Sequence, residues 1–146
     1  MEELGAQDNL IDAAYYAGEN CIAQGDLLGA HQWISRAQEA IGGCSEDQTT
    51  ISVQRGRLLR IQAATARLQG EVEQADELLS ESAEIFSASY ERLEAAKTAY
   101  ERGQLAQAKG NPLEAREFFE EARMIFYRLG AEKYLEKTEE TLVQIT

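Results

Sequence analysis

Ala-Lys-Gly-Asn-Pro-Leu-Glu-Ala, at residues 108–115, is the clearest of three related stretches that decide the fold. The others are Ala-Gln-Gly-Asp-Leu-Leu-Gly-Ala (23–30) and Leu-Gln-Gly-Glu-Val-Glu-Gln-Ala (68–75). Each has a glycine followed by an alanine five residues later. A glycine ends a helix easily because it adopts the left-handed conformation at low cost, and a small alanine lets two helices cross closely. These stretches predict three helix hairpins, with six repeat-packing residues: Gly25, Ala30, Gly70, Ala75, Gly110 and Ala115.

The residues after each alanine predict a buried helix face. Ile34, Leu79 and Phe119 follow the alanines by four residues, and three residues further on stand Ala37, Ser82 and Ala122. This spacing places all of them on one side of a helix. The helix that begins near Asn111 is the most clearly marked, since a capping Asn precedes Pro112 and the acidic Glu114. We expect helices at 8–24, 27–41, 50–69, 72–88, 90–109, 112–129 and 131–145, with a loop at 42–47.

Composition supports one all-α domain over residues 1–146, because the chain has one Pro and few β-branched residues. Its formal net charge of −12 argues against binding nucleic acid or an anionic membrane. No apolar run is long enough for a transmembrane span, and the first residues do not resemble a signal peptide, so we expect a cytoplasmic protein. Cys21 and Cys44 suggest neither a disulfide framework nor a metal site. No cofactor is expected.

The repeated pattern resembles the tetratricopeptide repeat family. Gly18 and Gly103 stand seven residues before Gly25 and Gly110, where that family places a small packing residue, and Ala63 takes this place in the middle repeat. The glycine intervals of 45 and 40 residues are similar to the longer-helix variety found in bacterial regulatory proteins. The family's aromatic residue near the start of the first helix is absent. The resemblance implies a right-handed superhelical stack of three hairpins, at about 8–41, 50–88 and 90–129, with a capping helix at 131–145.

Catalytic residues are scarce in this sequence. His31 is the single histidine, and no glycine-rich phosphate loop occurs. Paired acids such as Glu120 and Glu121 are adjacent on a helix and point in different directions. We therefore expect that the protein is not an enzyme.

Positive charge is concentrated in one predicted helix. Residues 48–70 carry a net charge of +4, whereas the segments 1–47, 71–110 and 111–146 each carry a net negative charge. Arg57, Arg60 and Arg67 follow helical spacing and predict one cationic stripe. If the family resemblance holds, the first helix of each hairpin lines a concave groove. The residues expected there are Arg57, Arg60, Arg67, Lys97, Tyr100, Tyr15 and Glu19.

Two interpretations of the stripe remain open. The arginines can meet acidic groups of a partner, because guanidinium donors suit carboxylates. Equally, they can pair with acids of neighbouring helices such as Glu71, Glu73 or Glu94.

The expected function is therefore a protein–protein interaction module that holds a peptide or partner protein in this groove, for example as the regulatory part of a larger signalling protein. The alternative is a self-associating structural domain. A homodimer would then bury an apolar edge made by Leu10, Ile11 and Ala14.

Overall fold

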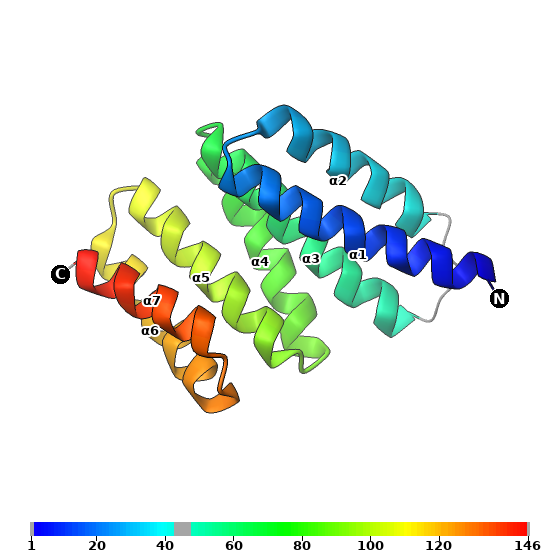
Figure 1. The fold of residues 1–146 in the computed structure, drawn as a ribbon. Helices are drawn as coiled ribbons and strands as arrows, with labels where there is room; N and C mark the ends of the chain where they lie inside the picture. Colours follow the sequence, from blue (N-terminus) through cyan, green and yellow to red (C-terminus); the bar gives the residue numbers. More distant parts are fainter. Residues whose placement is uncertain (1, 43–47, 146) are drawn as a thin grey trace.

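A computed structural model describes residues 2–42 and 48–145 of the chain. Those residues form α-helices and no strands, joined by short turns (Figure 1). The helices are α1 (Glu2–Ala23), α2 (Leu27–Gly42), α3 (Gln48–Leu68), α4 (Val72–Ala88), α5 (Arg92–Ala108), α6 (Pro112–Leu129) and α7 (Glu132–Gln144). The loop predicted at 42–47 lies, apart from Gly42, outside the described residues, and so does Cys44.

The helices pair into antiparallel hairpins that stack on one another. The most extensive contacts join α1 with α2, α3 with α4, and α5 with α6, while α7 packs on α6. Figure 1 shows the hairpins following one another from the N-terminal to the C-terminal end of the molecule. The first helices are also neighbours, since α3 contacts both α1 and α5. This arrangement confirms the predicted all-α stack of helix hairpins.

Four of the turns between helices are closed by a glycine. Gly25, Gly70, Gly110 and Gly130 have φ angles of 75°, 82°, 77° and 69°. In each turn the glycine N–H donates to the carbonyl three residues earlier, and the following N–H donates to the carbonyl five residues earlier. These paired bonds satisfy carbonyl groups at the helix end that would otherwise lack a partner.

Tyr90 takes the glycine position in the turn between α4 and α5. Its φ angle is 56°, and its N–H lies 3.4 Å from the carbonyl oxygen of Ser87. The sequence analysis placed Tyr90 at the start of a helix, and this was wrong: α5 begins at Arg92. No glycine marks this turn, so the pattern that identified the others could not find it.

The predicted buried face is confirmed. Ile34, Leu79, Phe119, Ala37, Ser82 and Ala122 are all buried. Ala30, Ala75 and Ala115 have no exposed surface, as expected for small residues at close helix crossings. A Cβ atom on Gly103 would lie 2.6 Å from the Phe119 ring, so this contact between α5 and α6 requires glycine.

The start of α6 also agrees with the prediction. Asn111 is the N-cap residue, and its side-chain oxygen accepts a hydrogen bond from the Glu114 N–H at 3.3 Å. Pro112 occupies the first helical turn, where its missing N–H costs no hydrogen bond.

Helix α7 covers the last hairpin with one face. Thr138 and Leu142 are buried, and Tyr134 stacks on Phe126 with 5.2 Å between the ring centroids. A shallow hollow on α7 is lined by three glutamates, Glu136, Glu139 and Glu140, with Val143 and Gln144. No helix in the described part of the chain is long and apolar enough to cross a membrane.

Candidate binding groove

A groove of about 490 Å³ runs along the first helices of the hairpins and α7. Its apolar lining includes Ile61 and Ala64 of α3 and Phe126 of α6. Six charged residues, two tyrosines and several polar groups surround this lining. The charged residues and tyrosines are Glu19, Arg60, Arg67, Lys97, Glu101, Lys137, Tyr100 and Tyr134.

A buried ion pair between Arg60 and Glu94 lies at one side of the groove. Arg60 Nη2 donates to Glu94 Oε2 at 2.7 Å and to the hydroxyl of Tyr15. Its Nη1 donates to the Glu94 carbonyl oxygen at 3.0 Å and to Thr98 at 3.3 Å. Arg60 and Glu94 are each only 4% exposed. The guanidinium of Arg60 is therefore committed to partners inside the protein.

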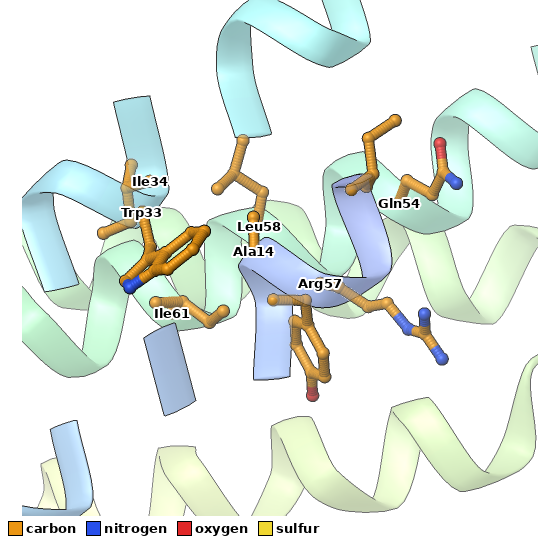
Figure 2. Close-up of a pocket in the computed structure, with 9 residues that line it drawn as sticks. Ala14, Trp33, Ile34, Gln54, Arg57, Leu58 and Ile61 are labelled. Atoms are coloured by element: carbon orange, nitrogen blue, oxygen red, sulfur yellow. The ribbon is translucent and has the colours of Figure 1, made fainter. Parts of the chain in front are cut away.

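Arg57 extends the same network toward α1. Its Nε lies 3.3 Å from Glu94 Oε1, and its Nη1 donates to Asp12 at 3.2 Å. The network thus joins three first helices, because Asp12 lies on α1, Arg57 on α3 and Glu94 on α5. A small pocket beside Arg57 has a volume of about 10 Å³, which leaves room for little more than one water molecule. Figure 2 shows Trp33 and Ile61 close together in this pocket, with the Arg57 guanidinium pointing away from them.

The charges around Glu94 determine its ionisation. Burial by itself would raise the pKa of Glu94, but Arg60, Lys97 and Arg57 outweigh it and lower the pKa. For Tyr15, burial raises the pKa above the usual range, and Arg60 reverses this only in part. Glu94 is therefore ionised and Tyr15 neutral at physiological pH.

Glu101 has a weaker set of partners in the groove. Its Oε2 lies 3.9 Å from Arg67 Nη2, and this buried oxygen accepts no hydrogen bond from the described residues. Arg67 Nη2 instead donates to Gln104 at 3.3 Å. Burial raises the pKa of Glu101, and the nearby charges of Arg67, Arg60 and Lys137 offset this only in part.

Two lysine–tyrosine contacts connect α5 and α7. Lys97 Nζ lies 4.8 Å from the centre of the Tyr134 ring, and Lys137 Nζ lies 5.1 Å from the centre of the Tyr100 ring. These distances are typical of cation–π contacts. The Tyr100 hydroxyl also forms a hydrogen bond of 2.9 Å with Thr141. Both lysines and both rings line the groove.

The structure brings most of the predicted groove residues together, but in unequal roles. Glu19, Arg60, Arg67, Lys97 and Tyr100 line the groove, whereas Tyr15 and Arg57 line the small pocket instead. The interpretation in which the stripe meets acidic groups of a partner does not hold for Arg60, which is buried against Glu94 of α5. The second interpretation of the stripe, pairing with Glu94, is what Arg57 and Arg60 do.

Sequence reasoning missed Glu101, Tyr134 and Lys137. Glu101 follows Lys97 by four residues and so shares its helix face. Lys137 and Tyr134 lie on α7, which the sequence analysis treated only as a cap. Extending the repeat pattern to α7 as a further first helix would have placed both in the groove.

Other sequence expectations can be located in the same way. His31 is exposed, and its Nε2 lies 3.0 Å from the Gln69 side-chain nitrogen, away from the groove. Within the described residues no cluster of three His, Cys, Asp or Glu side chains could hold a metal ion. At the proposed dimer edge Leu10 is exposed, but Ile11 and Ala14 are buried in the core.

Stacked helix hairpins with a groove lined by their first helices define a class of helical repeat proteins that serve as interaction scaffolds. A comparison with protein families agrees with this class: the tetratricopeptide repeat family matches residues 54–127, which is half of the chain. The chain belongs to the tetratricopeptide repeat family, and it is a protein–protein interaction module. No curated protein matches it closely enough to add a more specific function.

Proposed function

We propose that the groove between the first helices and α7 binds a short segment of a partner protein. The observation that carries this proposal is the groove itself, which combines a volume of about 490 Å³ with an apolar lining and a polar surround. Pockets of about 300–1,000 Å³ suit ligands of small-molecule size. The groove therefore accommodates a few residues of a peptide rather than a folded domain.

The side chains around the groove support recognition of a peptide. Ile61, Ala64 and Phe126 offer apolar surface, and Tyr100 and Tyr134 add aromatic rings, which are enriched where binding energy concentrates. Because Tyr100 and Tyr134 are already held by lysine contacts, by a hydrogen bond to Thr141 and by stacking on Phe126, little side-chain entropy of these rings is lost on binding.

Site-specific photo-crosslinking tests this proposal. A benzophenone amino acid in place of Gln104 lies in the groove, and the same replacement of Glu81, which is exposed on α4, provides the matched control. After irradiation in a cell lysate, we expect Gln104 to yield a discrete adduct that Glu81 does not. Mass spectrometry should then map the adduct to one short segment of the partner. Equal labelling at both positions, or no adduct in the groove, would contradict groove binding.

Self-association is the alternative function. Leu10 is the exposed residue of the expected edge, so a dimer there would bury little more than one side chain of that set. Sedimentation equilibrium of the unmodified protein decides between the two. A concentration-dependent dimer that Leu10→Glu abolishes would favour the alternative, and a monomer at all concentrations would favour the groove.

A further inference from the structure

We propose that the groove binds a primary carboxamide, the side chain of an Asn or Gln of the partner segment, between Glu101 and Gln104 of α5. This inference rests on the proposed function, because it assigns the chemistry of the groove's occupant. Two observations carry it. Glu101 has a buried oxygen that accepts no hydrogen bond from the described residues, and the orientation of the Gln104 amide is fixed by Arg67.

Glu101 offers an acceptor that the fold leaves without a donor. Its side chain lines the groove and is 22% exposed, and its one ion pair among the described residues is with Arg67, at 3.9 Å. That distance is too long for a hydrogen bond, and a buried acceptor without a donor destabilises a protein. Because the last torsion of a glutamate side chain turns easily, either carboxylate oxygen can meet a donor that enters the groove.

Gln104 supplies a donor one turn further along α5, and it also lines the groove. Its side-chain oxygen accepts a hydrogen bond from Arg67 Nη2 at 3.3 Å. Since an arginine side chain only donates, the oxygen must be the amide atom that faces Arg67. The amide nitrogen of Gln104 is then left without a partner among the described residues. Residues three apart are neighbours on a helix surface, so the groove presents an acceptor and a donor side by side.

A primary carboxamide complements this pair. It has two N–H donors and an acceptor oxygen, and one of its N–H groups lies on the same edge as the oxygen. The ligand's N–H therefore donates to Glu101 while its oxygen accepts from Gln104. A backbone peptide group does not match, because its N–H and C=O point to opposite sides of a trans peptide. The contact is thus specific for a side chain.

Charged side chains fit this place less well. A carboxylate only accepts hydrogen bonds, and its charge is repelled by Glu101. An ammonium or guanidinium group would donate to Glu101, but the charges of Arg67, Arg60 and Lys137 act on the same carboxylate and repel a further cation. A neutral donor is therefore favoured over either kind of ion.

The apolar lining strengthens the contact. Ile61, Ala64 and Phe126 line the same groove, so an occupant that covers them removes water from around Glu101. A hydrogen bond to a carboxylate becomes stronger as water is excluded. The expected ligand therefore carries its Asn or Gln next to an apolar residue.

Selection of random peptides displayed on phage tests this inference. We expect the selected peptides to be enriched in Asn or Gln next to apolar residues, and the enriched residue tells which of the two the groove prefers. In a selected peptide, an apolar replacement of similar size, Asn→Leu or Gln→Met, removes the hydrogen bonds to Glu101 and Gln104. Fluorescence anisotropy should then show binding to the unmodified protein that is about ten- to a hundredfold weaker.

A variant of the protein tests the same contact from the other side. Glu101→Met removes the acceptor at nearly unchanged side-chain length. It should bind the selected peptide about ten- to a hundredfold more weakly, and it should no longer distinguish that peptide from its apolar analogue. Glu81→Met, at an exposed position of α4 outside the groove, is the matched control and should keep both affinity and preference. Circular dichroism checks that both variants are folded.

Gln104→Trp separates the failure of this inference from the failure of groove binding. It places a bulky ring in the groove and should abolish selection. If it does so but the peptides selected by the unmodified protein are not enriched in Asn or Gln, or if Glu101→Met keeps the preference for the amide, the carboxamide proposal is overturned and groove binding stands. If no peptides are selected, or if Gln104→Trp selects the same ones, groove binding itself fails and the carboxamide proposal with it.

Discussion

Glu94 and Glu101 lie two turns apart on α5, and burial has opposite outcomes for them. Glu94 is surrounded by Arg60, Arg57 and Lys97, which more than compensate for its loss of water. Glu101 has one cation at 3.9 Å and an oxygen without a hydrogen bond from the described residues. A buried carboxylate stabilises a fold only when its partners outweigh its desolvation. The first glutamate is therefore expected to stabilise the protein and the second to destabilise it.

Glu94→Gln should lower the free energy of unfolding by about 3 kcal/mol at neutral pH, because it leaves Arg60 buried without its counter-charge. The folded-state pKa of Glu94 is lowered, so its contribution is complete above the unfolded pKa of about 4.3 and is lost as pH falls through the folded value. Urea unfolding of both proteins across acidic and neutral pH measures this. The gap between them should shrink in acid, and a gap independent of pH would contradict the role given to Glu94.

Glu101→Gln should have the opposite effect and raise the free energy of unfolding by about 1 kcal/mol at neutral pH. Here the folded-state pKa is raised, so the penalty of the charged carboxylate is absent below the unfolded pKa and complete above the folded one. The gain should therefore disappear in acid. The same urea experiment provides the measurement, and a loss of stability at neutral pH would show that the pair with Arg67 matters more than desolvation.

Among the described residues, the connection between α4 and α5 is where a residue other than glycine has a strained backbone. Tyr90 adopts a left-handed conformation that glycine adopts in the other turns. Because Tyr90 is 89% exposed, packing of its side chain does not compensate for the strain. For a residue with a Cβ this conformation costs about 1–2 kcal/mol. Helix α5 thus begins after a turn that lacks the glycine found in the other turns.

Tyr90→Gly should stabilise the protein by about 0.5–1 kcal/mol, since relief of strain exceeds the added freedom of glycine in the unfolded chain. Thermal unfolding followed by circular dichroism is the measurement. Gly110→Ala is the matched control at an equivalent turn, with φ of 77°, and should destabilise by about 1 kcal/mol. If Tyr90→Gly lowers the melting temperature, the tyrosine side chain contributes something other than strain.

At the scale of the whole molecule, the stack could be predicted from the sequence because its signals are local. The glycine of each marked turn, the alanine five residues later and the buried residues that follow lie within about twelve residues of one another. Each of these residues meets a steric requirement within a single hairpin, either in the turn or where its two helices pack. The turn at Tyr90 was not predicted, because a tyrosine gives no sequence signal for the left-handed conformation that it adopts.

The groove was harder to predict because its properties come from pairs far apart in sequence. Arg60 has helical spacing with Arg67, and the sequence alone left open whether it meets a partner or pairs with one of several acids, of which Glu94 on another helix is the one it contacts. Lys137 faces the groove only because α7 packs as a first helix does. Whether a cation is available to a partner depends on contacts between repeats, which a single repeat's pattern does not contain.

The cationic groove within an acidic molecule has a consequence for the rate at which an acidic segment binds. Far from the surface such a segment is repelled by a molecule whose net charge is −12. The lysines attract it only once it is near the groove. Salt shortens the reach of that repulsion, from about 30 Å at 0.01 M to about 8 Å at 0.15 M ionic strength. Added salt should therefore speed association while it also speeds dissociation. Stopped-flow mixing with an acidic peptide that binds the groove measures both rates. An association rate that falls with salt would mean that the groove's attraction reaches further than the repulsion around it.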